Sequence, residues 1–279
     1  ALSQYERGSR TTVAVKRVLV GVLVAVPLLV VFGSLFAAAD PVFAKYAAKI
    51  FNFHADPRLL RQIMQSLLVA SAVLGALGFM VTAATRDPGE RRLARPFGDL
   101  EAVVALGLVA LLFGSFILIQ VTYLFGGAQN IGADGLTYAD YARRGFFELL
   151  TVGVAALGTL SLADRFTKQT SGQHGRWFRS LSTLLVVQVL VILASSFQRL
   201  WLYEEAYGFS ALRLYSHAFT LLLTVVFGLF VIKLWRKLEA DWWLWRSFIA
   251  AMGALMVMNL ADPDAMIARL NLDRYHETG

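Results

Sequence analysis

The chain has no cysteine and only 4 histidines among its 279 residues. Without cysteine it forms no disulfide, carries no thiolate nucleophile and holds no Cys-ligated metal or iron–sulfur cluster. No two histidines have the i, i+4 spacing that places two metal ligands on one helix face. A G-x-S-x-G nucleophile motif is also missing. We therefore expect no catalytic residue, no metal and no cofactor among the motifs that a sequence can reveal.

Acidic residues and lysine are missing from the middle of the long apolar runs. Ion-coupled transporters and proton pumps need such groups at membrane depth, so this absence argues against both classes. The last run has no lysine for a retinal Schiff base, and only His217 comes near a run as a haem ligand would. The cationic surplus is spread along the chain rather than gathered in one basic domain, so we expect no nucleic-acid partner.

Long apolar runs are what the chain does have, with 57% hydrophobic and 16% charged residues against about 25% charged in soluble domains. The seven runs cover residues 13–39, 59–84, 100–125, 145–163, 181–202, 211–234 and 242–260. Each approaches the ~20 residues that a helix needs to cross ~30 Å of hydrocarbon. Their continuous Leu, Val and Ala content indicates helices rather than alternating barrel strands. The sequence predicts an all-α polytopic membrane protein, a bundle of about seven transmembrane helices forming one domain over residues 1–262.

Arginine and lysine indicate the orientation. The N-terminal segment and the loops after the second, fourth and sixth runs carry four each, 16 of the 26 in the chain. The positive-inside rule places these segments in the cytoplasm. We therefore expect a cytoplasmic N-terminus, an extracytoplasmic tail over residues 263–279 and a short interfacial helix on the outer side over residues 41–52. The expected N-cap residues are Asp99, Ser180 and Ser210.

Three segments rich in arginine, tyrosine and acidic residues stand at the predicted outer ends of the last four runs. They are residues 138–148, 199–217 and 259–271. The guanidinium fork suits carboxylate and phosphate, so the cluster is interpreted as a binding site for an anionic group. The predicted binding residues are Tyr141, Arg143, Arg144, Glu148, Arg199, Tyr203, Arg213, Tyr215, His217, Asp262 and Arg269.

Glu148 lies about one turn inside an apolar run, where an unpaired carboxylate is expensive. Its expected partners are Arg144, which is four residues away on the same helix face, Arg199 and Arg213. A structural ion-pair network and a ligand-binding site both explain such charges, and the sequence leaves both open. The adjacent acids at positions 204 and 205 are interpreted as solvated loop residues.

Four stretches resemble a bacterial multipass membrane family, the group of domains of unknown function 4153 and 4173. They are residues 39–43, 138–149, 207–215 and 264–272, and the run Tyr-Ala-Arg-Arg-Gly-Phe-Phe-Glu within the second is the specific one. The resemblance implies a location in the bacterial inner membrane and an unassigned activity, with no catalytic residues to transfer. Family members are often longer, so the chain is also interpreted as a possible part of a longer parent.

Three functional hypotheses follow. The leading one is a non-enzymatic membrane protein that binds a partner protein, a lipid headgroup or a small anion at the outer cluster. The second is a structural subunit of a larger membrane complex or a homo-oligomer, in which the cluster only supports the fold. The third is a membrane enzyme or transporter acting on a lipid-linked phosphate, which requires a membrane-depth cavity that reaches the cluster. Membrane lipid is an expected partner in all three.

Overall fold

The computed structural model describes residues 2–51, 98–125, 138–167 and 172–278. These residues form helices and no strand. The helices are α1 (Leu2–Ala39), α2 (Pro41–Phe51), α4 (Asp99–Phe125), α5 (Tyr138–Phe166), α6 (Gln173–Tyr207), α7 (Ala211–Arg236), α8 (Ala240–Leu260) and α9 (Pro263–Thr278).

Six of these helices, α1 and α4 to α8, are long and apolar enough to cross a membrane. The prediction of an all-helical multipass membrane protein is therefore confirmed. The run predicted at residues 59–84 lies outside the described residues, so the seventh span remains a prediction. The orientation also remains a prediction.

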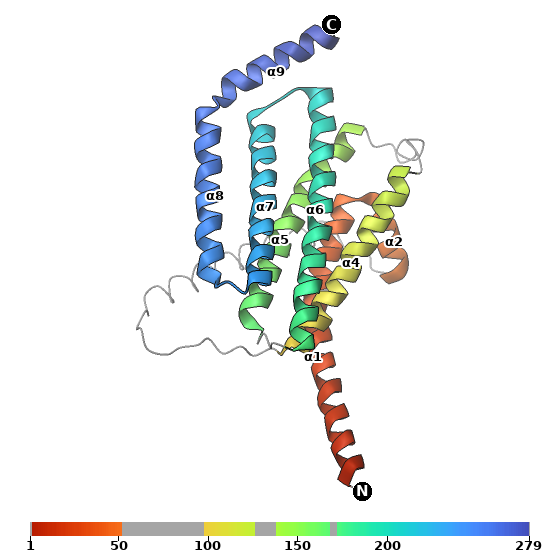
Figure 1. The fold of residues 1–279 in the computed structure, drawn as a ribbon. Coiled ribbons are helices and arrows are strands. Elements are labelled where there is room, and N and C mark those ends of the chain that lie inside the picture. The colour runs from red at the N-terminus through yellow and green to blue at the C-terminus, as the bar shows by residue number, and fades with distance from the viewer. Residues whose placement is uncertain (1, 52–97, 126–137, 168–171, 279) are drawn as a thin grey trace.

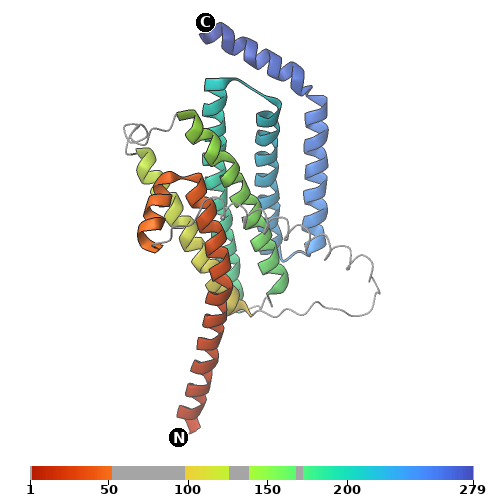
Figure 2. The ribbon, with the colours of Figure 1, turned by 180° about the vertical axis from the view of Figure 1, so that it is seen from behind.

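The long helices form a bundle in which α1 packs on α4 and α5, and α6 packs on α4, α5 and α7 (Figure 1). Viewed from behind, α2 turns back beside α1, while the N-terminal part of α1 projects beyond the bundle (Figure 2). α8 packs against α7, and α9 leads away across the opposite end of the molecule. We call the end where α7 finishes and α8 begins the basic end. The end where α6 finishes and α7 begins is the corner end.

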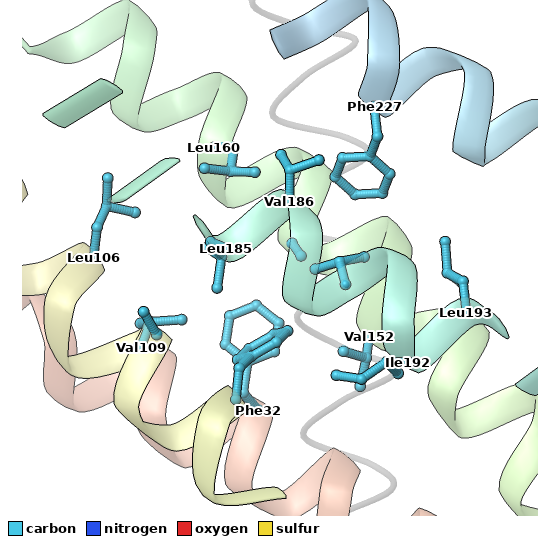
Figure 3. Close-up of a cluster of buried hydrophobic side chains, with 14 of the residues drawn as sticks. Phe32, Leu106, Val109, Val152, Leu160, Leu185, Val186, Ile192, Leu193 and Phe227 are labelled. Carbon is cyan, nitrogen blue, oxygen red and sulfur yellow. The ribbon is translucent and has the colours of Figure 1, made fainter. Parts of the chain in front are cut away.

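Aromatic and branched side chains fill the space between these helices. Phe36 on α1 stacks on Phe116 of α4 with ring centroids 4.1 Å apart, and it meets Phe113 edge-on at 4.9 Å. Further along the bundle, aliphatic residues of α4, α5 and α6 interdigitate with Phe32 and Phe227 (Figure 3). Because lipid tails are as apolar as these side chains, close packing rather than removal from water holds the helices together.

Several helix ends differ from the sequence prediction. α5 begins at Tyr138 and α6 covers Gln173–Tyr207, so both extend beyond their apolar runs at 145–163 and 181–202. The apolar run marks only the part of a helix suited to hydrocarbon, and the helix continues where polar side chains meet water or headgroups.

The expected caps were wrong at Ser180, which lies inside α6, and at Asp99, which is the first residue of α4. Ser210 does precede α7, but its side chain makes no capping hydrogen bond. The predicted tail is the helix α9.

Candidate functional site

Arg199 joins α6 to the junction of α1 and α2, about two turns before α6 ends. Its Nη2 lies 3.3 Å from Oδ2 of Asp40, and its Nη1 donates to the carbonyl of Ala39 at 3.2 Å. Both side chains are buried, with 9% and 4% of their surfaces exposed. The other oxygen of Asp40 accepts the backbone N–H groups of Val42 and Phe43, which caps α2. One carboxylate therefore fixes both a helix start and a contact between distant helices.

The backbone of α5 comes close to this ion pair at Gly145. A β-carbon on that residue would clash with Nη1 of Arg199 and lie 2.9 Å from the carbonyl oxygen of Ala39. The absence of a side chain thus lets α5 approach the guanidinium and the end of α1. This is the packing reason for glycine in the middle of the 138–149 stretch.

Glu204 and His217 connect α6 to α7 at the corner end. Oε2 of Glu204 lies 2.8 Å from Nε2 of His217, and Phe197 packs against the imidazole with centroids 4.2 Å apart. Glu204 is 1% exposed, so its interpretation as a solvated loop residue was wrong. The error arose because α6 continues beyond the apolar run and turns this carboxylate toward α7. Within the described residues, Oε1 of Glu204 and Nδ1 of His217 have no hydrogen-bond partner.

Arg213 lies at the corner itself, over the ring of Tyr203 with its guanidinium carbon 4.3 Å from the centroid. Its Nη1 donates to the carbonyl of Gly208. Among the described side chains, no carboxylate comes within ion-pair distance of Arg213. Arg274 of α9 approaches the same place, since its Nη1 would be 3.0 Å from a β-carbon on Gly208. Two guanidinium groups therefore converge on one glycine.

Asn271 attaches α9 to this corner by two hydrogen bonds to the backbone of Phe209. Its Oδ1 accepts the Phe209 N–H at 2.7 Å, and its Nδ2 donates to the Phe209 carbonyl at 3.1 Å. Gly208 makes this approach possible, because its φ of 78° is left-handed and a β-carbon there would lie 2.7 Å from Oδ1 of Asn271. The corner, its two arginines and α9 thus form one assembly.

The other predicted binding residues with described side chains are spread over α5, α7, the junction of α8 and α9, and α9. Tyr215 is half-exposed on α7 and Glu148 is half-buried on α5. Asp262 lies between α8 and α9 with a φ of 46°, and its Oδ1 accepts the N–H of Ala265 at 3.4 Å. Arg269 is exposed on α9. The side chains of Tyr141, Arg143 and Arg144 lie outside the described part, although their backbone belongs to α5.

Of the predicted binding residues, Arg213 and Tyr203 are in contact, and His217 contacts Glu204 instead. Asn271, Arg274 and Gly208 were not predicted as parts of the corner. The glycine and the asparagine were within stretches that carried the family resemblance, and that was the signal available. Within the residues that the structure describes, no group of three His, Asp or Glu side chains is arranged to hold a metal ion. What the corner offers is cationic hydrogen-bond donors on an aromatic support.

Comparison with known proteins adds a family to this geometry. No match was found among curated proteins or among solved structures. A family model described as a domain of unknown function, DUF4153, matches residues 2–279. With its six helices of membrane-spanning length and composition, the chain is a multipass membrane protein of unassigned activity. It belongs to the DUF4153 family.

Proposed function

We propose that this protein is a non-enzymatic binding protein of the bacterial inner membrane, and that its corner end binds an anionic group. The group is a phosphate or a carboxylate carried by a lipid headgroup, a small anion or a partner protein. The observation that carries the proposal is Arg213, a half-buried cation with no carboxylate partner among the described side chains. Such a cation is stabilised by a charge-assisted hydrogen bond to an anion that enters from outside the protein.

The support around Arg213 is suited to this role. The ring of Tyr203 lies under the guanidinium and the Gly208 carbonyl uses one of its donors, so the group is oriented before a ligand arrives. A preoriented fork loses little conformational freedom on binding and matches the paired oxygens of phosphate or carboxylate. Arg274 supplies a second positive charge from α9. Arg199, by contrast, acts as a structural residue in this proposal, because Asp40 and Ala39 already hold it.

The proposal is tested by anion-dependent stability of the full chain in a mild, uncharged detergent. Inorganic phosphate and citrate are titrated while unfolding is followed by circular dichroism. We expect both anions to raise the unfolding temperature of the parent protein. Arg213→Gln should lose most of the citrate effect, because a tenfold weaker Kd removes about 1.4 kcal/mol of ligand-linked stability at saturation.

The matched control is Arg236→Gln, at the other end of the same helix, where the side chain is exposed. This variant should respond to citrate like the parent. If both variants lose the response equally, the effect is one of overall charge and the corner is not the site. If neither anion stabilises the parent protein, the proposal fails.

A second candidate function, a subunit of a larger membrane complex, is favoured by α8. Only 6% of this helix's spanning window is buried within the described structure, against 22% to 39% in the other five. Its exposed side chains include Phe248, Met252 and Met256, which suit either lipid or another protein. Native mass spectrometry after extraction in mild detergent separates these cases, since a persistent hetero-complex supports the subunit role and a single chain contradicts it.

A further inference from the structure

A cavity of about 660 Å³ lies at the basic end of the bundle, far along α7 from the corner. It is bounded by the last turns of α5, the first turns of α6, the end of α7 and the start of α8. Its volume falls in the range of ~300–1,000 Å³ that is typical of small-molecule sites. The loops here were predicted to be plainly basic and to face the cytoplasm, and they contributed no residue to the predicted binding cluster.

The cavity wall carries four cations and three carboxylates, and one pair of them is mutually satisfied. Lys233 donates to Oδ2 of Asp164, with 7% and 11% of the two side chains exposed. This pair joins α7 to α5 and contributes no net charge. The acids that remain, Glu239 and Asp241, are exposed at the start of α8, where negative charge is favourable at a helix N-terminus.

Arg179 is the cation of the cavity wall that lies against an aromatic ring and keeps an unused hydrogen-bond donor. Its guanidinium lies 5.9 Å from the ring centroid of Trp235, and that indole donates to the hydroxyl of Thr183 at 3.0 Å. Thr183 in turn donates to the backbone carbonyl of Arg179 at 2.8 Å. The tryptophan is therefore tied to α6 beside the arginine. Nε of Arg179 is buried, and it has no hydrogen-bond partner among the described residues.

The lining of the cavity also has an apolar part. Phe230 and Trp243 meet edge-to-face with centroids 5.5 Å apart, and the Trp243 indole donates to the carbonyl of Val226 at 3.2 Å. Because that N–H is satisfied within the protein, the Trp243 indole has no free hydrogen-bond donor for a ligand. Leu234 and Leu244 add to this apolar part of the wall. The cavity therefore combines positively charged side chains with an apolar surface. An amphiphile has the matching parts, an anionic headgroup and an apolar tail.

Exposed tryptophans indicate the depth of the cavity in the bilayer. Trp177, Trp235 and Trp245 are each more than half exposed at the basic end. Tryptophan gathers at the level of lipid headgroups, where its ring and its N–H meet different surroundings. Basic pockets between transmembrane helices at this level are suited to lipid headgroups.

We propose that this cavity binds the phosphate group of a phospholipid, with Arg179 and Arg165 as its donors and the Phe230–Trp243 wall against the first part of an acyl chain. The site is separate from the corner end and goes beyond the function proposed above. A free phosphate ion shares the recognition chemistry with the headgroup, but it does not use the apolar wall.

Native mass spectrometry of the delipidated full chain tests the proposal, with dioleoyl phosphatidylglycerol and inorganic phosphate as the two probes. We expect discrete retention of one lipid by the parent protein. Arg179→Gln should weaken that retention about tenfold, which corresponds to the loss of one charge-assisted hydrogen bond. Arg165→Gln, at an exposed position, should weaken it in the same direction.

The matched control is Arg246→Gln, at the same end of the bundle. Arg246 lies over Trp242 at 4.6 Å and is not among the residues that line the cavity. Its variant should retain lipid like the parent. Equal losses in Arg246→Gln and Arg179→Gln would mean diffuse attraction and would overturn the site, as would unchanged retention in both Arg179→Gln and Arg165→Gln. If inorganic phosphate competes with the lipid only in proteins that keep Arg179, the phosphate is confirmed as the recognised group.

Discussion

The ion pair between Arg199 and Asp40 allows the sharpest test of how the helices are held together. Replacing Arg199 by methionine keeps an unbranched apolar stem but removes the guanidinium that lies against the buried carboxylate of Asp40. Breaking one side of a buried ion pair costs about 3–5 kcal/mol. We expect about 3 kcal/mol, at the lower end, because the two hydrogen bonds from the guanidinium are long, at 3.2 and 3.3 Å.

Two variants of Asp40 separate its two roles. Asp40→Asn keeps an oxygen that can accept the N–H groups at the start of α2, but it removes the charge. Asp40→Ala removes the cap as well, and it should cost about 1 kcal/mol more than the asparagine variant. In the double variant Arg199→Met/Asp40→Asn both members of the ion pair are neutral, so its cost should fall below the sum of the single costs by about 2 kcal/mol.

The assay is reversible unfolding in mixed micelles, with the fraction of SDS increased and helix content followed by circular dichroism. The free energy of unfolding is compared among the parent, the three single variants and the double variant. Additive costs in the double variant, or a cost below about 1 kcal/mol for Arg199→Met, would refute the reasoning, because an exposed pair behaves in that way.

Two further predictions concern the approach of α5 and the attachment of α9. Gly145→Ala should destabilise the protein by about 1–3 kcal/mol in the same assay, because its β-carbon meets Arg199 and a backbone carbonyl; Gly158→Ala, with open space at the same helix's other end, should be neutral or slightly stabilising, and equal losses would contradict the packing argument. Asn271→Ala should speed amide hydrogen exchange throughout α9 by removing both of its bonds to the corner, whereas Asp273→Ala on the exposed side should not, and unchanged exchange in the first variant would show that other contacts hold α9.

The class of the protein was readable from the sequence because membrane spans are a local property. An apolar run long enough to cross a bilayer requires no knowledge of neighbouring helices, so six of the expected spans reappear as helices. The limits of each helix were less accurate, since α6 continues through Glu204 and Tyr207 after its apolar run has ended. Hydropathy indicates which residues of a helix prefer hydrocarbon to water. It does not indicate how far the backbone hydrogen bonds of the helix continue.

Partners across helices were much harder to predict. Local spacing suggested Arg144 as a partner for Glu148, because residues four apart share a helix face. It could not suggest Asp40 for Arg199, which lies 159 positions away, or Asp164 for Lys233, which lies 69 positions away. Such pairs depend on which helices are neighbours and on how far each slides along the other. That register is set by packing of the kind seen between Phe36 and Phe116.

The connection of α9 to the corner has a mechanical consequence for α8. Covalent turns lead from α7 into α8 and from α8 into α9, and the two hydrogen bonds of Asn271 return the chain to Phe209, next to the start of α7. α7, α8 and α9 therefore form a closed loop in space. α8 packs against α7 and is connected to the bundle at both of its ends. It therefore cannot rotate away from α7 about one end alone. Displacing α8 at the corner end therefore requires the two hydrogen bonds of Asn271 to break, together with the other contacts between α9 and α7.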